Sequence, residues 1–436
     1  MILRRPTGIL AAAFIITWSA LVLRAQDWPQ WRGAGRDAKT AGFTAPKTWP
    51  KELKQVWKTT VGAGDASPVL VGERLYVFSR QETDEVTRCL DAATGKELWT
   101  DKCPCATPIS GPDARQHSGP RSSPAVGNGR LVTLGVAGTL SCLDAASGTL
   151  NWRKDDFPGA WPRFHVASSP LIVNGMVVAQ LGKESEGGIF AYDLATGAVK
   201  WKWTEEGPGY ASPVPCSVAG TPMIVALTAK SVVAVSAVDG TPLWRAPYAP
   251  QGMAYNAATP IVEGTTVVYC GQGRDTIAVT LEKQGNEFVA KELWKNPDNA
   301  VQFSTPVLRG GFLFGLSARS DFFCINARDG KTVWTAPLSP AAAGADAQPQ
   351  PQGQGGMRGG RGMGRTAGYG SIVDAGSVLL ALSPASQLVV FEPNDKAYTE
   401  LARIKVTDSP TYTYPVVSGK RLFVKDQDAI TLWNLE

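Results

Sequence analysis

The side chains of this 436-residue chain that could do chemistry are few. Its two histidines, His117 and His165, each stand a few residues before a Ser-Ser-Pro stretch that opens an apolar run. Two imidazoles brought together could hold a metal ion, but such a site also needs thiolate or carboxylate ligands. No matching set of ligands accompanies them. We therefore predict no metal site, and we expect both histidines to bond to backbone groups of their loops.

The seven cysteines are of two kinds. Cys89, Cys142 and Cys324 occupy equivalent positions of a repeat described below, so we expect them to fill one type of buried site as small apolar side chains. Cys103 and Cys105 flank a proline, and in an oxidising compartment they could form a strained disulfide or remain reduced. The chain lacks a Cys-x-x-Cys-His pattern, which excludes covalent attachment of a c-type haem.

The elements that would position these residues come from a short motif that returns along the chain. An Asp, or a Ser or Asn in its place, precedes a Trp by eight residues, and a Gly stands four residues before the Trp. The copies are Asp91/Gly95/Trp99, Asp144/Gly148/Trp152, Asp193/Gly197/Trp201, Ser236/Gly240/Trp244 and Asn326/Gly330/Trp334. The spacing predicts a tight hairpin in which the short polar side chain accepts bonds from backbone amides and the Gly adopts a positive φ. The Trp then begins the next strand as a buried anchor.

A second motif marks where each repeat begins. A Ser-Pro or Thr-Pro pair followed by an apolar run returns roughly every 45 residues, and four strands fit between consecutive pairs. No long stretch shows apolar spacing of helical period, so the chain reads as all-β. We predict an eight-bladed β-propeller with four-stranded blades. The blades start near residues 67, 123, 169, 212, 259, 305, 370 and 414.

The two ends of the chain complete each other in this scheme. The eighth unit finishes with Asn434 in the position of the Asp, and so it lacks a fourth strand and its Trp. The stretch from Leu53 to Val61, which contains Trp57, reads as a fourth strand without the first three. We predict that this amino-terminal strand completes the last blade, closes the ring and removes an exposed sheet edge.

Two segments read as lying outside the ring. Residues 1–25 have the features of a secretory signal peptide, with an apolar run from Ile9 to Val22 that is shorter than the ~20 residues of a spanning helix, and with Ala25 at the cleavage site. An uncleaved membrane anchor is the alternative. No Cys follows the run, so the lipid anchor of a bacterial lipoprotein is not available. We expect residues 26–436 to be a monomeric single propeller in the periplasm or outside the cell, without a membrane anchor. Residues 340–368, rich in Gly, Pro and Gln, read as a disordered insertion.

The formal net charge of +5 argues against one class of partner. Six of the arginines stand in those two outlying segments: Arg4, Arg5, Arg24, Arg358, Arg361 and Arg365. The remaining chain is close to neutral and lacks the basic face that binding to a phosphate backbone requires. We therefore predict no nucleic-acid partner.

The motif from Leu90 to Trp99, LDAATGKELW, resembles the tryptophan-docking blade of bacterial quinoprotein (pyrroloquinoline quinone) β-propellers. The stretch from Asp27 to Gly33, DWPQWRG, resembles the segment that precedes the first blade in exported members. The resemblance implies one of two activities. Some members are dehydrogenases that hold the quinone and Ca²⁺ at the ring centre, and others are non-enzymatic propellers such as the BamB-type outer-membrane assembly factors. A third group is known only as quinone-like repeat proteins, and this chain is most similar to that group.

A quinone-dependent dehydrogenase would need an indole against the quinone, an Arg near its carbonyls, oxygen ligands for Ca²⁺ and an Asp as general base. The resemblance offers few residues for these roles: Trp161, Arg121 or Arg274, and the acids Asp65 and Asp275. The dehydrogenases also have two adjacent cysteines, whereas a proline separates them here. We assign no catalytic residue and no cofactor, and pyrroloquinoline quinone with calcium stays an open alternative.

In a propeller, the loops that join the blades gather around the central funnel on one face, where function usually lies. The residues at these positions differ from blade to blade, as is typical of a binding surface on a rigid frame. The candidate binding residues are Asp65, His117, Arg121, His165, Tyr210, Asn256, Arg274, Phe303 and Tyr412, with Tyr255 and Tyr369 as close neighbours. We predict an exported, non-catalytic scaffold that binds a protein or small molecule there. A periplasmic quinone-dependent dehydrogenase and a BamB-like assembly factor are the alternatives.

Overall fold

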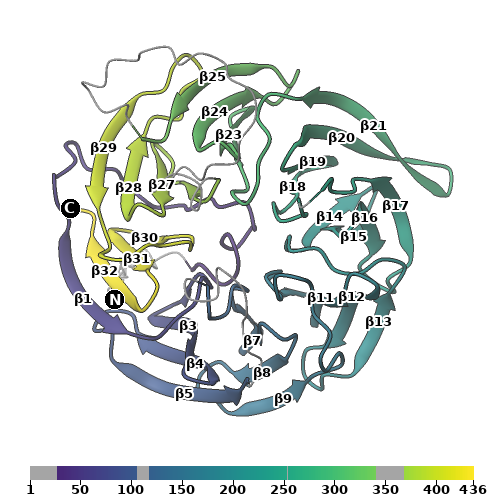
Figure 1. Cartoon of the computed structure of the whole chain (residues 1–436), viewed down its shortest axis with the longest axis horizontal. Coiled ribbons are helices and arrows are strands. Elements are labelled where there is room, and N and C mark those ends of the chain that lie inside the picture. The colour runs from purple at the N-terminus through teal and green to yellow at the C-terminus, as the bar shows by residue number, and fades with distance from the viewer. Residues whose placement is uncertain (1–26, 106–116, 253, 340–367) are drawn as a thin grey trace, which may run out of the picture.

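The computed structural model describes residues 27–105, 117–252, 254–339 and 368–436. Within these residues, 32 strands and no helix form eight antiparallel four-stranded sheets arranged as a ring (Figure 1). The predicted all-β, eight-bladed propeller is confirmed. The predicted signal peptide, residues 1–25, lies outside the described residues, and so does the predicted Gly-rich insertion, residues 340–368, except for Gly368. In the described part of the chain, no helix is long and apolar enough to cross a membrane.

Each sheet is one blade, and in the first seven the strands follow the sequence from the axis outward. Blade 1 consists of β2 (Val69–Val71), β3 (Arg74–Gln81), β4 (Asp84–Asp91) and β5 (Glu97–Pro104), and blade 2 of β6 (Ala125–Gly127), β7 (Arg130–Leu134), β8 (Leu140–Asp144) and β9 (Leu150–Lys154). Blade 3 consists of β10 (Leu171–Val173), β11 (Met176–Lys183), β12 (Glu186–Asp193) and β13 (Val199–Trp203), and blade 4 of β14 (Val214–Val218), β15 (Thr221–Leu227), β16 (Ser231–Ser236) and β17 (Pro242–Pro247). Blade 5 consists of β18 (Ile261–Glu263), β19 (Thr266–Gly271), β20 (Arg274–Gln284) and β21 (Glu287–Asn296), and blade 6 of β22 (Val307–Arg309), β23 (Phe312–Leu316), β24 (Asp321–Asn326) and β25 (Thr332–Pro337). Blade 7 consists of β26 (Ser371–Asp374), β27 (Leu379–Ser383), β28 (Gln387–Phe391) and β29 (Glu400–Lys405), and blade 8 of β30 (Val416–Ser418), β31 (Arg421–Lys425), β32 (Ala429–Asn434) and β1 (Lys54–Thr60).

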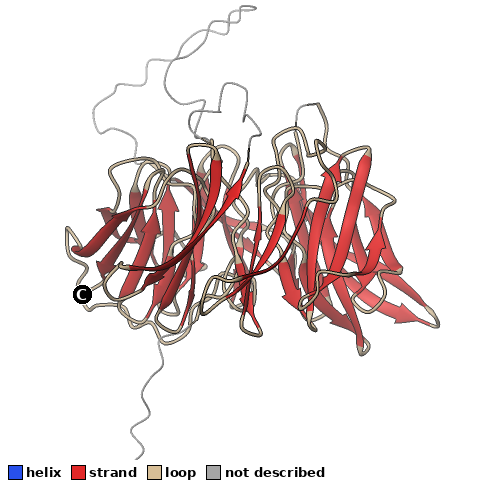
Figure 2. Ribbon diagram, turned by 90° about the horizontal axis from the view of Figure 1, so that it is seen from below, coloured by secondary structure: helices blue, strands red, loops and turns tan. Residues whose placement is uncertain are grey.

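The last blade is built from both ends of the chain. Its strands have the order β1-β32-β31-β30, and β1 pairs with β32 from Lys54 opposite Asn434 to Thr60 opposite Ala429. The predicted ring closure is therefore confirmed. Seen from the side, the strands run between two rims of loops (Figure 2). The loops that join one blade to the next lie on the rim that we call the funnel face, and the hairpins between third and fourth strands lie on the opposite rim.

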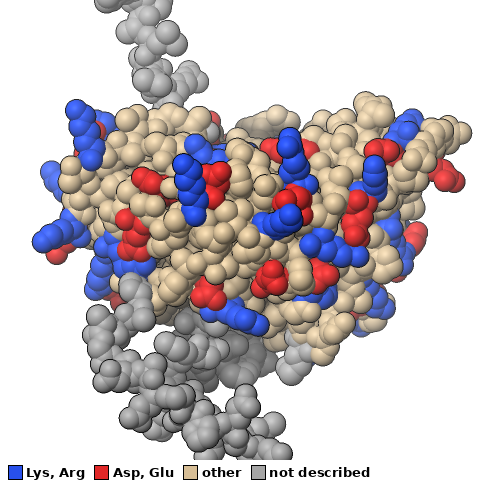
Figure 3. Space-filling view, turned by 90° about the horizontal axis from the view of Figure 1, so that it is seen from above, with Lys and Arg blue, Asp and Glu red and all other residues tan. Residues whose placement is uncertain are grey.

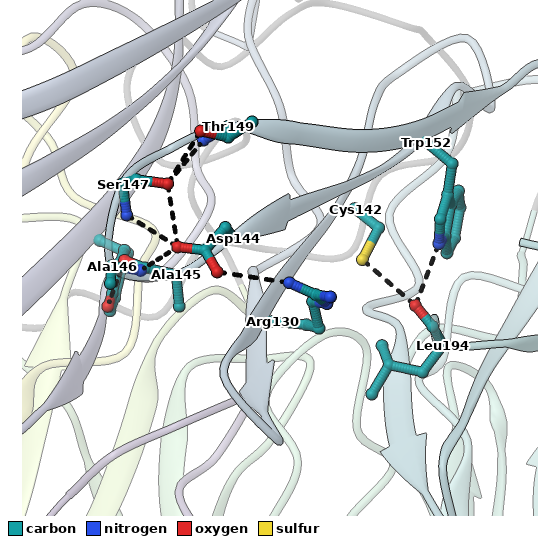
Figure 4. Close-up of polar contacts among 10 residues, drawn as sticks. Arg130, Cys142, Asp144, Ala145, Ala146, Ser147, Thr149, Trp152 and Leu194 are labelled. Atoms are coloured by element: carbon teal, nitrogen blue, oxygen red, sulfur yellow. Dashed lines mark hydrogen bonds and ion pairs between the residues drawn. The ribbon is translucent and has the colours of Figure 1, made fainter. Parts of the chain in front are cut away.

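The repeated hairpin has the predicted geometry. Oδ1 of Asp144 accepts hydrogen bonds from the backbone N–H groups of Ala146 at 3.1 Å and Ser147 at 2.9 Å (Figure 4). Gly148 has φ of 75°, and a Cβ atom at this position would lie 2.5 Å from the indole of Trp99 in the preceding blade. The glycine is therefore needed both for its backbone conformation and for the close approach of the docked tryptophan.

The tryptophans and cysteines of the repeat fill the space between neighbouring blades. Nε1 of Trp152 donates to the backbone oxygen of Leu194 at 3.0 Å, and Sγ of Cys142 lies 3.5 Å from the same oxygen (Figure 4). Cys89 and Cys324 are fully buried like Cys142, as their equivalent positions predict.

The Ser-Pro and Thr-Pro pairs join the blades around the axis. Each inner strand begins one or two residues after the predicted start, and the hydroxyl group before the proline accepts a hydrogen bond from the equivalent backbone N–H of the preceding blade. These bonds run from Ser67 to Ser123, Ser123 to Ser169, Ser169 to Ser212, Ser212 to Thr259 and Thr259 to Thr305, with lengths from 2.9 to 3.2 Å. Oγ of Ser67 in turn accepts from the backbone N–H of Tyr414 at 2.8 Å, so the series crosses the point of closure.

The segment ahead of β1 enters the centre of the ring, where Figure 1 shows its purple trace. Trp28, Arg32 and Arg36 of this segment are almost completely buried. In the side view of Figure 3, basic and acidic side chains are interspersed, and no basic face appears on this side.

Candidate functional site

Each of the eight loops that join the blades places one large polar or aromatic side chain near the axis on the funnel face. We call this set the funnel ring. In the order of the loops after β1, β5, β9, β13, β17, β21, β25 and β29, its members are Asp65, His117, Phe164, Tyr210, Tyr255, Phe303, Tyr369 and Tyr412.

The aromatic members contact one another from loop to loop around the axis. Tyr255 lies 5.0 Å from Phe164 and 5.8 Å from Phe303, measured between ring centroids. Phe303 and Tyr369 stack with centroids 3.9 Å apart and planes 15° apart, and Tyr412 meets Tyr369 edge-on at 5.0 Å. Rings from blades that are far apart in the sequence therefore form one continuous aromatic cluster at the mouth of the funnel.

The remaining side of the ring is polar. Nδ1 of His117 lies 2.6 Å from Oδ2 of Asp65, and both side chains are about 10% exposed. Arg121 donates from Nη2 to the backbone oxygen of His117 at 3.1 Å and from Nη1 to the backbone oxygen of Phe164. The backbone N–H of Phe164 donates to the hydroxyl group of Tyr210 at 3.1 Å. These contacts link four consecutive inter-blade loops.

A buried lysine supports the polar side from blade 8. Lys425 ends β31 and is fully buried, and its Nζ donates to the backbone oxygens of Gly64 at 2.5 Å and Asp426 at 3.0 Å. Burial lowers the pKa of Lys425 to about 8, although the nearby carboxylates of Asp65 and Asp426 oppose this shift. Its contact with Gly64 fixes the backbone next to Asp65, so Lys425 positions the acid of the funnel ring.

The hydroxyl groups of Tyr210 and Tyr369 in the ring remain protonated. Burial raises the pKa of Tyr210 to about 12, and it raises the pKa of Tyr369 well above its ordinary value. These tyrosines therefore act as neutral hydrogen-bonding groups on an apolar body rather than as bases.

The structure brings together six of the nine residues predicted for the site. Asp65, His117, Tyr210, Phe303 and Tyr412 belong to the funnel ring, and Arg121 lies beside it. Prediction from sequence missed Phe164 and named Tyr255 and Tyr369 only as neighbours. Loop length explains the miss, because these residues stand at different distances from the proline that opens each blade. Aromatic residues in the loops were the available signal.

Two other predicted residues lie off the ring and have structural partners. Asn256 is buried, and its Nδ2 donates to the backbone oxygens of Thr228 at 2.8 Å and Tyr248 at 3.2 Å. Arg274 donates to the same oxygen of Tyr248 at 2.6 Å, and its guanidinium lies 4.1 Å from the centroid of the Tyr248 ring. Both side chains tie the loops of blades 4 and 5 together.

His165 directly follows the ring member Phe164 in the sequence, and its side chain is buried. It has φ of 63°, and its ring stacks on Trp161 with centroids 5.6 Å apart. Burial lowers the pKa of His165, and the guanidinium of Arg121 contributes to the shift. Its Nδ1 has no hydrogen-bond partner among the described residues, so the expected bond to the backbone is not observed at this atom.

The funnel ring does not fit a quinone with calcium. The stacked rings of Phe303 and Tyr369 leave no space for a third ring between them, and the indole of Trp161 is already stacked on His165. The acid of the ring is already paired with His117. Among the described residues, no three His, Cys, Asp or Glu side chains gather as a metal site would require. Cys103 lies near the end of β5 and Cys105 directly follows that strand, and no disulfide joins them.

The comparisons with known proteins agree with this architecture. The sequence model of the family described as outer membrane protein assembly factor BamB matches residues 82–336. The outer membrane protein assembly factor BamB of Burkholderia pseudomallei (strain K96243) is 25% identical over 303 residues, which are 65% of this chain and 69% of that protein. The quinohemoprotein alcohol dehydrogenase of Comamonas testosteroni is 29% identical over 164 residues, which are 35% of this chain but only 22% of the enzyme.

Two solved structures show the same fold. BamB from Moraxella catarrhalis matches with a TM-score of 0.61 and 14% identity, over 88% of this chain and 98% of that chain. The quinohemoprotein alcohol dehydrogenase from Comamonas testosteroni matches with a TM-score of 0.65 and 14% identity, over 95% and 81%. The structural matches show the fold alone, but the family's sequence model covers more than half of the chain. The protein is therefore a quinoprotein-like β-propeller and belongs to the family described as outer membrane protein assembly factor BamB.

Proposed function

We propose that this propeller is an exported, non-catalytic scaffold of the cell envelope that binds a protein partner with its funnel face. The observation that supports this proposal is the funnel ring. Eight loops contribute eight different side chains, six of them Phe or Tyr, to one surface on a rigid frame. Aromatic residues and Arg are enriched at the centres of protein interfaces, because they bury a large area with little loss of conformational freedom.

The arrangement of the ring also suits a partner rather than a reaction. Its polar groups are already paired, since Asp65 contacts His117, and Arg121 beside the ring is held by two backbone oxygens. A catalytic acid or base would need to reach a substrate. Phe164 is the most accessible member, with 37% of its surface exposed, and Arg121 holds the backbone beside it. We propose that Phe164 is the anchor of the interface.

The family relation favours a protein over a small molecule as the partner. The matched relative from Burkholderia is named an assembly factor, whereas the quinohemoprotein dehydrogenase shares only part of its length with this chain. The absence of a fit for the quinone points in the same direction. We also propose export to the periplasm, because the matched relative is named an assembly factor of the outer membrane.

Site-specific crosslinking tests the proposal. A photo-reactive amino acid at Phe164 should crosslink a discrete protein in the intact envelope of producing cells. The same group at Val238 is the matched control, because Val238 is 69% exposed in a hairpin on the opposite rim. Equal crosslinking from both positions, or none from Phe164, would refute a partner at the funnel face.

A second measurement addresses the quinone-dependent alternative. Purified protein is titrated with pyrroloquinoline quinone and Ca²⁺ by calorimetry, and dye reduction is followed with a panel of alcohols and sugars. We expect neither stoichiometric binding nor turnover. Binding at one quinone per chain together with turnover would overturn the non-catalytic proposal.

A further inference from the structure

The segment from residue 27 to 40, which we call the axial segment, lies in the centre of the ring. It enters on the rim opposite the funnel face, where Oδ1 of Asp27 accepts from the backbone N–H of Gly72 at 2.8 Å. It leaves beside the end of β26, where the backbone N–H of Thr40 donates to the oxygen of Asp374 at 2.8 Å. Both ends therefore lie on one side of the channel, and the segment makes a turn inside it.

The axial segment contacts the inner edge of every blade. Its hydrogen-bond partners in blades 1 to 8 are, in order, Leu70, Val126, Pro170, Pro213, Thr259, Thr305 with Pro306, Asp374, and Tyr414 with Val417. Most of these partners contribute a backbone oxygen. Six of the eight blades therefore present an inward-facing backbone carbonyl group to this one short peptide, whereas blades 2 and 5 contribute the N–H of Val126 and the hydroxyl group of Thr259.

Two arginines make the most specific of these contacts. Arg32 donates from Nη1 to the backbone oxygen of Thr305 at 2.7 Å and from Nη2 to that of Pro306 at 2.9 Å. Arg36 donates from Nη1 to the oxygen of Pro213 at 2.7 Å and from Nη2 to that of Pro170. Each guanidinium thus joins two carbonyl groups with the fixed fork of donors that a lysine lacks.

The charge of these arginines is balanced by dipoles rather than by ions. In the part of the chain that the structure describes, no carboxylate forms an ion pair with Arg32 or Arg36. Burial lowers the pKa of Arg36 to about 9. A buried cation without a counter-ion is costly unless hydrogen bonds satisfy all its donors. The backbone carbonyl groups just before the inner strands therefore form sites that suit the guanidinium groups of Arg32 and Arg36.

The axial segment has a defined backbone conformation with an internal hydrogen bond. Arg32 and Arg36 have φ of 61° and 55°, and the backbone N–H of Ala38 donates to the oxygen of Arg32 at 2.8 Å. Trp28 is 1% exposed and pairs with Leu70 through two backbone hydrogen bonds of 2.7 and 2.9 Å. Residues 41–48 then lead away along the surface, and several of them are exposed. The axial segment is a compact unit joined to the propeller by an exposed connection.

We propose that the axial channel is a peptide-recognition site, with the axial segment as its resident ligand. The site selects a peptide that presents a tryptophan and two guanidinium groups at the spacing of Trp28, Arg32 and Arg36. Apart from the chain connection at residues 41–48, only non-covalent contacts hold the segment. The same segment from a second copy of this chain therefore takes its place when the resident one is cut away or weakened.

The test uses the full chain, with a protease recognition sequence inserted in the exposed connection at residues 44–48. The protein is cut after folding, and a fluorescent peptide of residues 27–40 is added. We expect the cut segment to stay bound during gel filtration and to exchange with the labelled peptide at one site per chain. A control peptide with Arg32→Lys and Arg36→Lys should bind at least tenfold more weakly.

A second variant keeps the result decisive if exchange from the cut protein is slow. In the uncut chain with Arg32→Lys and Arg36→Lys, the weakened resident segment should be displaced by the labelled wild-type peptide. The proposal is wrong if the labelled peptide binds neither protein while circular dichroism shows an intact β-fold. It is equally wrong if the Lys-containing peptide binds as tightly as the wild-type peptide.

Discussion

Nδ1 of His117 lies 2.6 Å from Oδ2 of Asp65, and this contact joins the loop that follows β1 to the loop that follows β5. The first of these loops begins at the strand that the amino terminus contributes to the last blade. The pair therefore connects the closing strand of the ring to the first complete blade. Around it, the backbone N–H groups of Asp65 and Ala66 both donate to the oxygen of Pro120.

We predict that His117→Ala lowers the free energy of unfolding by about 1–3 kcal/mol, because it leaves the carboxylate of Asp65 buried without its partner. Urea unfolding at pH 7 measures the change. The control is Lys183→Ala, which removes an exposed ion pair with Glu186 and should change stability by less than about 0.5 kcal/mol. Equal effects of the two substitutions would mean that the contact with Asp65 is not stabilising.

The docking of a tryptophan on the hairpin glycine of the next blade makes a second prediction. Gly148→Ala places a Cβ atom 2.5 Å from the indole of Trp99 at a residue with φ of 75°. Gly129 has φ of 72° in another hairpin, and a Cβ atom added there would meet no other atom within 4 Å. Gly129→Ala should therefore cost about 1–2 kcal/mol for backbone strain alone.

Gly148→Ala should cost more than Gly129→Ala, because the clash with Trp99 adds to the same backbone strain. Thermal and urea unfolding of both variants give the difference. If both substitutions destabilise the protein equally, the tryptophan moves aside without loss, and docking does not contribute to the stability of the ring.

The fold could be predicted from sequence because its signals are local and repeated. Asp144 and Gly148 define one hairpin within five residues, and the same spacing recurs in four other blades. Ring closure followed from Trp57, since a strand with its tryptophan stood at one end and a blade without one at the other. The hairpin could be inferred from residues close together in the sequence, and ring closure from the number of tryptophan strands compared with the number of blades.

The site was only partly predictable because it depends on contacts between distant residues. Phe164 stands farther from the proline that opens its blade than Tyr210 or Phe303 does, so this distance did not reveal it. The axial segment was not foreseen as the filling of the channel. Arg32 and Arg36 bind backbone oxygens, and backbone oxygens leave no signature in the sequence of the blades that supply them.

A buried acid predicts how stability depends on pH on the acid side. Oε1 of Glu85 accepts from the backbone N–H of Val136 in the next blade at 2.7 Å, and burial raises the pKa of Glu85 from 4.5 to about 7. The folded state thus holds a proton that the unfolded state releases between these values. Stability from this group is full below pH 4.5 and is lost as the pH rises through 7, on the order of 3 kcal/mol.

Glu85→Gln should remove this dependence and make the protein more stable than wild type at pH 8, with little change at pH 4.5. Urea unfolding between pH 4.5 and 8 checks the difference. The exposed Glu287→Gln is the control, and its stability curve should run parallel to that of wild type. A Glu85→Gln curve that also runs parallel would show that folding does not raise the pKa of Glu85.

Lys425 predicts a dependence of the opposite sign on the alkaline side. Burial lowers its pKa from 10.5 to about 8, so between these values the unfolded state binds the proton and the folded state does not. Stability therefore rises with pH across this window, by on the order of 3 kcal/mol. Lys425→Met should flatten the rise, whereas Lys230→Met, on an exposed residue between β15 and β16, should leave it unchanged. Urea unfolding from pH 7.5 to 10.5 compares the slopes. A rise that survives in Lys425→Met would place its origin in another group, of which buried Arg36 is the first to test.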